Sequence, residues 1–480
     1  MDFDTALKEV GEFGSFQKKI FFITNILAFT VNSQMLIMVF TAAKPEWSCP
    51  NSATQCNTDG SICSNAHFTT NFTSISSEFG LICDESYKAE VVQSVYMLGT
   101  LIAAPLTGNL GDTYGRKKLW IVTYTGTCIF AFISAFSTSY HMYLVCRFFV
   151  GFFVGGCGLI IFVLTTESVG IAYRGFVGIV QQTFFTLFLV VLGGLAYLIP
   201  DWRQLTLITL LPAIIQVFFF KSTPESPRWL VSKGRNREAE EVLSEAARVN
   251  KGHKMNLVLR SKIQEKKEDS SKGIISIFMH RTTCLITLNL CLSFFVNSLV
   301  YYGLSLNVKN LGGSLHVNFI LSALVEFPSY VISFFLMTWL GRRKTIFIFM
   351  MGASISCFAC MRLLESPSST QYLISSVAML GKFFISSSFS IIYVYGSELL
   401  PTVVRNSGLG VASVANRIGG ILCPGVVALG EHSKSMPMLV FAACAFVSGV
   451  VGLKLPETKG RALPETFEDV DNSSKLYAKS

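Results

Sequence analysis

Two apolar runs in the first half of the chain are joined by Gly108-Asn109-Leu110-Gly111-Asp112-Thr113-Tyr114-Gly115-Arg116-Lys117-Lys118. Its glycines permit a tight turn and a close approach of helices. Its aspartate can cap a helix or pair with the basic residues that follow. A degenerate copy, Leu340-Gly341-Arg342-Arg343-Lys344, follows another apolar run about half a chain later. Such a repeat predicts two homologous halves, related by an axis along the membrane normal.

The composition places the chain in a membrane. Of its 480 residues, 51% are hydrophobic and 14% are charged, and the mean hydropathy is +0.50. A soluble protein carries roughly a quarter charged residues. These values exclude a soluble enzyme, a nucleic-acid binder and a disordered scaffold. The net charge of +9 fits Lys and Arg in cytoplasmic loops beside anionic lipid.

Apolar runs of about twenty residues, each long enough to cross a bilayer as a helix, recur along the chain. Six precede a long polar stretch, namely Ile20–Phe40, Val91–Leu110, Leu119–Phe136, Tyr140–Thr165, Phe176–Ile199 and Trp202–Phe220. Six follow it, namely Cys284–Leu306, Val317–Leu340, Thr345–Leu364, Tyr372–Tyr395, Ser407–Leu429 and Met436–Leu455. The sequence therefore predicts an all-α polytopic membrane protein, with twelve transmembrane helices in two six-helix halves.

The distribution of Lys and Arg predicts the orientation. With the N-terminus in the cytoplasm, the segments on that side hold most of the basic residues, and the opposite face holds only Lys44, Lys88, Arg203, Lys309, Arg362 and Lys434. Both termini are therefore expected in the cytoplasm. The expected divisions are a cytoplasmic N-terminus (1–19), a first half (20–220) with an exterior loop (41–89), a cytoplasmic linker (221–283), a second half (284–455) and a cytoplasmic tail (456–480).

The exterior loop carries the sequon Asn71-Phe72-Thr73 and four cysteines, Cys49, Cys56, Cys63 and Cys83. Four exterior cysteines indicate two disulfides, for which three connectivities are possible. A glycan is expected on Asn71 if the protein passes through a secretory pathway. The other nine cysteines form no metal pattern and are expected to pack as small apolar residues.

The cytoplasmic linker contains a predicted amphipathic helix around Arg237–Ala247, where apolar residues recur at helical spacing. We expect this helix to pack under the membrane-spanning bundle.

Further motifs follow the spans in order. They are Glu167 with Arg174, Pro224-Glu225-Ser226-Pro227-Arg228-Trp229-Leu230, Tyr395-Gly396-Ser397-Glu398-Leu399-Leu400-Pro401-Thr402-Val403-Val404-Arg405-Asn406 and Leu455-Pro456-Glu457-Thr458-Lys459-Gly460. With the repeated loop motif, the chain resembles the major facilitator superfamily. With its cysteine-bearing exterior loop, it resembles the organic cation, anion and carnitine transporter family over nearly its whole length.

The resemblance implies that the loop motifs are conformational latches and not substrate ligands. The candidate latch residues are Gly108, Asp112, Gly115, Arg116, Glu167, Arg174, Arg342, Arg343, Glu398 and Arg405. Simple capping and packing at helix ends is the alternative interpretation. Local pairing of Glu398 with Arg405 would fit it, and the two interpretations are compatible.

Charged residues within spans mark candidate functional positions, because a charge at bilayer depth costs roughly 2.5–3.5 kcal/mol on insertion scales. Glu326, Lys382 and Arg417 lie near mid-depth of the second half and could converge on a central cavity. Lys382 could instead form a purely structural bridge with Glu326. Arg147 is either a structural anchor or a cavity residue, and the glycines that follow it four apart give a smooth face for close packing.

The resemblance also bears on the substrate. Organic cation carriers have an Asp where this chain has Arg417, and anion and carnitine carriers have an Arg. Glu326 matches the Glu of cation and carnitine carriers, whereas anion carriers usually place a Lys where this chain has Tyr330. This mixed signature most resembles the carnitine and zwitterion branch.

The residue chemistry agrees with that branch. A guanidinium can hold a carboxylate through two parallel hydrogen bonds. Aromatic side chains could hold a trimethylammonium group by cation–π contact, although each could equally serve packing. The aromatic candidates are Tyr301, Tyr302, Tyr330, Tyr393 and Phe384.

The sequence thus predicts a plasma-membrane carrier, expected to be monomeric, for small organic cations or zwitterions, working by alternating access. It predicts no enzyme, no nucleic-acid partner, no metal and no cofactor. An organic anion carrier and a non-transporting receptor of the same fold are the alternatives. Direct coupling of transport to protons is not expected, because Lys382 or Arg417 would keep Glu326 ionised. Coupling to sodium or to the membrane potential is expected instead.

Overall fold

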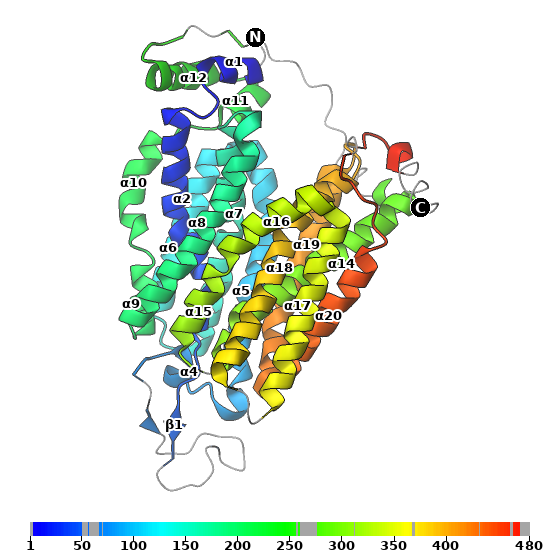
Figure 1. Cartoon of the computed structure of the whole chain (residues 1–480). Helices are drawn as coiled ribbons and strands as arrows, with labels where there is room; N and C mark the ends of the chain where they lie inside the picture. Colours follow the sequence, from blue (N-terminus) through cyan, green and yellow to red (C-terminus); the bar gives the residue numbers. More distant parts are fainter. Residues whose placement is uncertain are drawn as a thin grey trace. The chain divides into compact units, whose positions relative to one another are not determined.

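The computed structural model describes residues 3–49, 56, 67–69, 71–255, 258–259, 276–311, 313–366, 370–431, 433–460 and 464–470 (Figure 1). Ten helical segments of this part are long and apolar enough to cross a membrane, and α20 (Met436–Gly452) is a shorter apolar helix. All twelve predicted spans are helical, which agrees with the predicted fold class.

The spans of the first half are α2 (Ser15–Leu36) with α3 (Met38–Thr41), α5 (Tyr87–Tyr114), α6 (Arg116–Ala135), α7 (Tyr140–Glu167), α8 (Ile171–Leu198), and α9 (Trp202–Ile208) with α10 (Pro212–Ser222). Those of the second half are α14 (Arg281–Asn307), α15 (Leu315–Leu324) with α16 (Glu326–Leu340), α17 (Arg342–Glu365), α18 (Gln371–Leu399), α19 (Arg405–Ala428) and α20. Short elements outside the spans are α1 (Phe3–Val10), α4 (Ile75–Glu78), α11 (Pro227–Ser232), α12 (Asn236–Lys251), η1 (Cys83–Glu85), η2 (Val308–Asn310) and η3 (Leu429–Glu431).

Two predicted continuous spans are broken at prolines. The helix α9 ends at Ile208, four residues before Pro212, and α15 ends at Leu324, four residues before Pro328. Proline has no N–H to bond the carbonyl four residues back, and its ring clashes with that carbonyl. The second break places Glu326 at the first position of α16.

The described chain groups into two compact units. Unit 1 comprises Met1–Thr41, Asn71–Ile75 and Val95–Lys266, and unit 2 comprises Ala42–Thr70, Ser76–Ser94 and Lys267–Ser480. The sequence assigned the whole exterior loop to the first half, whereas most of it groups here with unit 2. The helix α5 begins in unit 2 and continues into unit 1.

Close helix packing in unit 1 uses the glycines that follow Arg147. A Cβ on Gly151 would lie 2.0 Å from the carbonyl oxygen of Tyr96, and one on Gly155 would lie 2.8 Å from the Cα of Thr100. Both partners belong to α5, so the prediction of a smooth face on α7 is confirmed. In unit 2, α14 packs on α19, and α17 packs on α18 and α20 (Figure 1).

The loop before α5 contains a short antiparallel pair, in which β1 (Trp47–Ser48) lies beside β2 (His67–Phe68). A disulfide joins Cys56 to Cys83, and Cys49 is also disulfide-bonded. Cys63 lies outside the described residues. Asn71 is exposed, and its glycan stays a prediction.

The predicted linker helix is confirmed as α12, which lies beside α1 and α11 (Figure 1). Their buried side chains form one apolar cluster that includes Leu7, Trp229 and Leu243. Asn250, near the end of α12, fastens this cluster to α2. Its Oδ1 accepts from the Phe16 N–H at 2.9 Å, and its Nδ2 donates to the Val10 carbonyl at 3.2 Å.

Candidate functional site

A buried ion pair occupies the centre of the candidate site. The Nζ of Lys382 on α18 lies 3.1 Å from Oε1 of Glu326, and the two side chains are 3% and 0% exposed. The same ammonium donates to the Ser305 hydroxyl at 2.6 Å and lies 3.2 Å from the centre of the Tyr301 ring. The structural bridge between Lys382 and Glu326 is therefore present.

The carboxylate of Glu326 is held by hydroxyl donors as well. Tyr301 on α14 donates to its Oε1 at 2.7 Å, and Tyr330 on α16 donates to its Oε2 at 3.0 Å. The carboxylate of Glu326 thus accepts two hydroxyls and faces one ammonium. The arrangement of ammonium, carboxylate and aromatic face is the one in which proteins also hold organic ammonium groups.

Arg417 is the other charged residue predicted for this site. It is half-buried on α19 and, within the part of the chain that the structure describes, forms no ion pair or hydrogen bond. The neighbouring Asn416 donates from Nδ2 to the Tyr393 hydroxyl at 3.0 Å. The guanidinium thus keeps its donors available for an anionic group.

A row of aromatic rings connects the ion pair to the surroundings of Arg417. The rings of Tyr301 and Phe389 have centres 5.4 Å apart, and those of Phe389 and Tyr393 have centres 5.8 Å apart. The first ring lies against Lys382, and the hydroxyl of the last accepts from Asn416, the residue before Arg417. The row therefore leads from Lys382 to the segment of α19 that carries Arg417.

Four of the predicted substrate residues are in direct contact, namely Glu326, Lys382, Tyr301 and Tyr330. Tyr393 joins them through the aromatic row, and Arg417 follows Asn416, which donates to the Tyr393 hydroxyl. Sequence reasoning missed Ser305 and Phe389. Ser305 follows Tyr301 by one helical turn and Phe389 follows Lys382 by two, so helical spacing could have indicated both. Phe384 instead packs against α17.

Arg147 acts as a structural anchor within unit 1. It is 1% exposed, and it donates to the Gln34 side chain at 2.8 Å and to the Gln34 carbonyl at 3.3 Å. Its guanidinium also lies over the rings of Tyr96 and Tyr143. These partners leave it engaged in packing between α2, α5 and α7.

The first latch motif forms a turn closed by an acidic residue. Gly115 has φ +104°, a conformation that favours glycine, and a Cβ there would lie 2.3 Å from Oε2 of Glu225. Oε1 of Glu225 accepts from the backbone N–H groups of Arg116 at 2.9 Å and Lys117 at 3.0 Å. The carboxylate therefore sits at the N-terminus of α6, where the helix dipole favours a negative charge.

An ion pair ties this turn to the end of α7. Arg116 donates through Nε and Nη2 to both carboxylate oxygens of Glu167, at 3.2 and 3.1 Å. The Ser226 hydroxyl donates to the same carboxylate at 2.6 Å, and Arg116 also pairs with Asp112 at 2.9 Å.

The second latch motif repeats the turn. Gly341 has φ +89°, and a Cβ there would lie 2.6 Å from Oε2 of Glu457. The carboxylate of Glu457 accepts from the backbone N–H groups of Arg342 at 2.8 Å and Arg343 at 3.0 Å, at the N-terminus of α17.

The ion pair is repeated too. Arg342 donates from Nη2 to Glu398 at 2.8 Å, and the Thr458 hydroxyl donates to the same carboxylate at 2.5 Å. Residue for residue, this copies the arrangement in unit 1, which supports two homologous halves. Sequence reasoning quoted the motifs with Glu225, Ser226, Glu457 and Thr458 but missed these residues as latch members.

Three candidate latch residues lie elsewhere. Arg405 donates to the Leu400 carbonyl at 3.3 Å, so the expected local pair with Glu398 is replaced by the pair of Glu398 with Arg342. Arg174 lies 3.8 Å from the carboxylate of Asp4 on α1. Gly108 lies inside α5, where a Cβ would meet nothing within 4 Å, so the turn forms only at Gly115.

Comparison with known proteins places this architecture. Residues 28–469 match the family described as "Sugar (and other) transporter". The "Organic cation transporter protein" of Drosophila melanogaster is 33% identical, over 100% of this chain and 96% of its own length. The "Organic cation/carnitine transporter 4" of Arabidopsis thaliana is 34% identical, over 95% of this chain and 88% of its own.

Among solved structures, the inward open conformation of the xylose transporter XylE from E. coli matches with a TM-score of 0.68, over 95% of this chain and 99% of that chain. At 15% identity, this match shows the fold alone.

Proposed function

Because the chain belongs to the sugar (and other) transporter family, and within it to the organic cation and carnitine transporters, we propose that it carries small organic cations or zwitterions across a membrane by alternating access. The substrate class we favour is a carnitine-like quaternary amine. No bond of the substrate changes, and the protein is not an enzyme.

The observation that carries this proposal is the pairing of two fixed charges of opposite sign in one cluster. Glu326 supplies a carboxylate beneath the Tyr301 ring, and Arg417 supplies a guanidinium without a hydrogen-bond partner in the described chain. A zwitterion presents an ammonium to the first and a carboxylate to the second.

Lys382 shows how an ammonium fits the first position. Its charge sits on Glu326 and over the Tyr301 ring, as a substrate ammonium would. A substrate cation enters by sharing or replacing that contact, so the binding energy of the substrate offsets the loss of a buried pair.

The remaining features of the proposal concern the membrane. The two latch clusters lie at the cytoplasmic ends of the spans, both termini are cytoplasmic, and the protein acts as a monomer in the plasma membrane without a resident cofactor. The excess of basic residues on that side supports this orientation. Transport is driven by the substrate gradient, by membrane potential or by sodium.

The test is uptake of labelled carnitine, tetraethylammonium and para-aminohippurate, side by side, by cells that express the chain at matched surface levels. Saturable uptake of carnitine or tetraethylammonium is expected. Uptake of para-aminohippurate alone would identify an anion carrier instead. A surface-expressed chain with no saturable uptake of any of the three would contradict the transport proposal and favour a receptor.

A further inference from the structure

A second partly buried ion pair lies away from the candidate site. Lys309 on η2 pairs with Glu90 in the first turn of α5, and their side chains are 15% and 10% exposed. Neither residue has a role in the site or in the latches described above. Pairing is important for charges that are largely removed from water, because breaking such a pair leaves one charge uncompensated.

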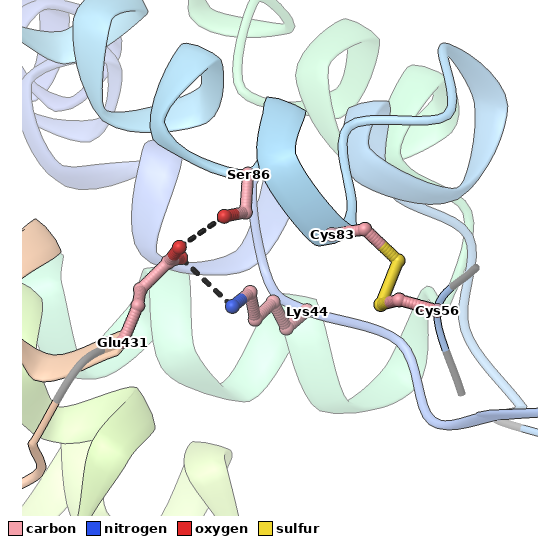
Figure 2. Close-up of a disulfide and its surroundings, with 5 residues drawn as sticks. All are labelled: Lys44, Cys56, Cys83, Ser86 and Glu431. Carbon is pink, nitrogen blue, oxygen red and sulfur yellow. Dashed lines mark hydrogen bonds and ion pairs between the residues drawn. A yellow bond between two sulfur atoms is a disulfide. The ribbon is translucent and has the colours of Figure 1, made fainter. Parts of the chain in front are cut away.

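A third pair lies beside it, nearer to solvent. The carboxylate of Glu431 on η3 lies between the Lys44 ammonium, at 2.7 Å, and the Ser86 hydroxyl, which donates to it (Figure 2). The Lys44 and Glu431 side chains are 45% and 29% exposed. These three Lys–Glu pairs, Lys44–Glu431, Lys309–Glu90 and Lys382–Glu326, run from exposed, through partly buried, to fully buried.

The contacts of α5 follow a single face. Ser86, Glu90 and Ser94 are spaced by four residues, which places them one above the other along the helix and the residue before it. Ser86 contacts Glu431, Glu90 contacts Lys309, and Ser94 donates to the Ile421 carbonyl of α19 at 2.9 Å. One polar stripe thus fastens the start of α5 to η3, η2 and α19.

A covalent bond holds the start of this stripe in place. Cys83, three residues before Ser86, is joined by a disulfide to Cys56 (Figure 2). Cys83 also has φ +58°, a conformation rarely adopted by residues other than glycine. The disulfide therefore fixes the direction in which the chain enters α5.

The buried thiol of Cys423 lies on α19 two residues after Ile421, whose carbonyl accepts from Ser94. Its side chain is 0% exposed. The thiol is therefore within one helical turn of the point where the stripe is bonded to α19.

The helix α5 is shared between the two units. Its residues up to Ser94 group with unit 2, and those from Val95 onward group with unit 1. Gly99, one turn further, packs so closely that a Cβ would lie 2.3 Å from the Phe148 carbonyl of α7. A rearrangement of the two units must therefore bend α5 near this junction or break the polar stripe.

We propose that Ser86, Glu90 and Ser94 form the exterior gate of the transport path, and that the ion pair of Glu90 with Lys309 is its closing contact. This rests on the proposed transport function. The gate is closed when the stripe is formed, and it opens when the stripe separates and water hydrates the freed charges. A pair that is only partly buried suits this role, because both charges can be rehydrated without crossing an apolar interior.

Cys423 offers a native reporter for the test. The rate at which a membrane-impermeant, positively charged thiosulfonate reagent modifies this thiol from outside the cell measures how often the gate opens. The variants are Glu90→Gln, Lys309→Met and the exchanged pair Glu90→Lys with Lys309→Glu. Cys423→Ala supplies the background, and Arg362→Met removes an exposed ion pair of the same unit as a matched control.

Each single variant is expected to react about tenfold faster than the native protein, which corresponds to about 1.4 kcal/mol of lost closure. The exchanged pair and Arg362→Met are expected to react at the native rate. Native rates in both single variants, or a fast rate in the exchanged pair, would overturn the gate. If a single variant does not reach the surface, the exchanged pair decides alone: native surface expression with slow labelling supports the gate, and fast labelling refutes it.

Labelling needs no substrate, so it separates the gate from the transport proposal. Pair-dependent labelling without uptake of any tested substrate would leave the gate in place and refute the assigned substrate class. Substrate uptake together with a labelling rate that is unaffected by changes at Glu90 and Lys309 would support the transport proposal and refute the gate.

Discussion

Lys382 resolves a difficulty at the scale of single residues, because an isolated carboxylate at bilayer depth would be strongly unfavourable. Its ammonium, together with the hydroxyls of Tyr301 and Tyr330, gives Glu326 a full set of partners. Arg417 has no such set in the described chain, which makes it the charge available to a ligand.

The first prediction follows from that difference. Arg417→Ala is expected to abolish uptake of carboxylate-bearing substrates while surface expression stays largely intact, because it removes an anion site and breaks no contact. Arg417→Lys should retain part of the uptake, since it keeps the charge but loses the planar two-donor geometry. Labelled uptake with surface biotinylation checks both, and normal uptake of every substrate in Arg417→Ala would show the assignment to be wrong.

The second prediction concerns stability. Glu326→Gln and Lys382→Met should each lower the stability of the purified protein by about 3–5 kcal/mol, because each leaves a buried charge without its partner. The double variant should lose much less than the sum of the two. Thermal unfolding in detergent measures the cycle, and additive losses would mean that the two residues do not stabilise each other.

At this scale the sequence was sufficient to select the charged residues of the site, but not to predict which groups their neighbouring side chains contact. Mid-span charge alone selected Glu326, Lys382 and Arg417, and the pairing of the first two was foreseen as one interpretation. The Tyr301 ring was expected to face a substrate cation, whereas it faces Lys382. Which cation a ring meets depends on how α14 packs against α18, and no local pattern encodes that packing.

At the scale of elements, the same kind of turn, closed by an acidic residue, joins two spans in each unit: α5 to α6 at Gly115, and α16 to α17 at Gly341. Glycine with positive φ, arginine, a capping carboxylate and an ion pair to the end of the following helix recur in both units. The copies differ at one place. Four residues before the arginine stands Asp112 in the first copy and Thr338 in the second, and Thr338 only bonds its own helix.

The third prediction uses this difference. Arg116→Ala should slow maximal turnover more than Asp112→Ala does, because Glu167 is 17% exposed and Asp112 is 55% exposed, and exposed pairs contribute little. Neither change should alter apparent affinity much, since both residues act on the conformational step. Uptake kinetics separate the two effects; a large affinity change at normal maximal rate would contradict the latch role.

The sequence was sufficient to predict the twelve spans, but not to predict which of them are interrupted. Pro212 and Pro328 break their spans, whereas Pro105 and Pro424 lie inside uninterrupted α5 and α19. All four were visible in the sequence. Whether a proline kinks or ends a helix depends on what neighbouring helices supply to the freed carbonyl, which is a tertiary property.

At the scale of the whole molecule, the boundary between units passes through α5 as well as through the polar linker. The sequence placed the exterior loop with the first half because loop and half are contiguous in the chain. Contacts made by Lys44, Ser86 and Glu90 group most of that loop with unit 2 instead. Such contacts join residues hundreds of positions apart, so composition and periodicity do not report them.

The fourth prediction concerns energy coupling. No direct proton coupling is expected, because Glu326 is the mid-depth carboxylate of the site and is already engaged by Lys382, Tyr301 and Tyr330. Substrate-induced proton flux is measured in proteoliposomes without sodium at clamped potential. Stoichiometric proton entry that disappears in Glu326→Gln would reverse this expectation and make Glu326 the coupling residue.

The bond between Asn250 and the first turn of α2 has a consequence for biosynthesis. Phe16, whose N–H it accepts, precedes it by 234 residues. A ribosome adds about 5–20 residues each second, so about 12–47 s pass between the two. During that time the first span is already made, but its opening turn lacks this acceptor. The helix α2 is therefore completed only after the sixth span has followed it, and a chain stalled before residue 250 retains an unfinished first turn of α2.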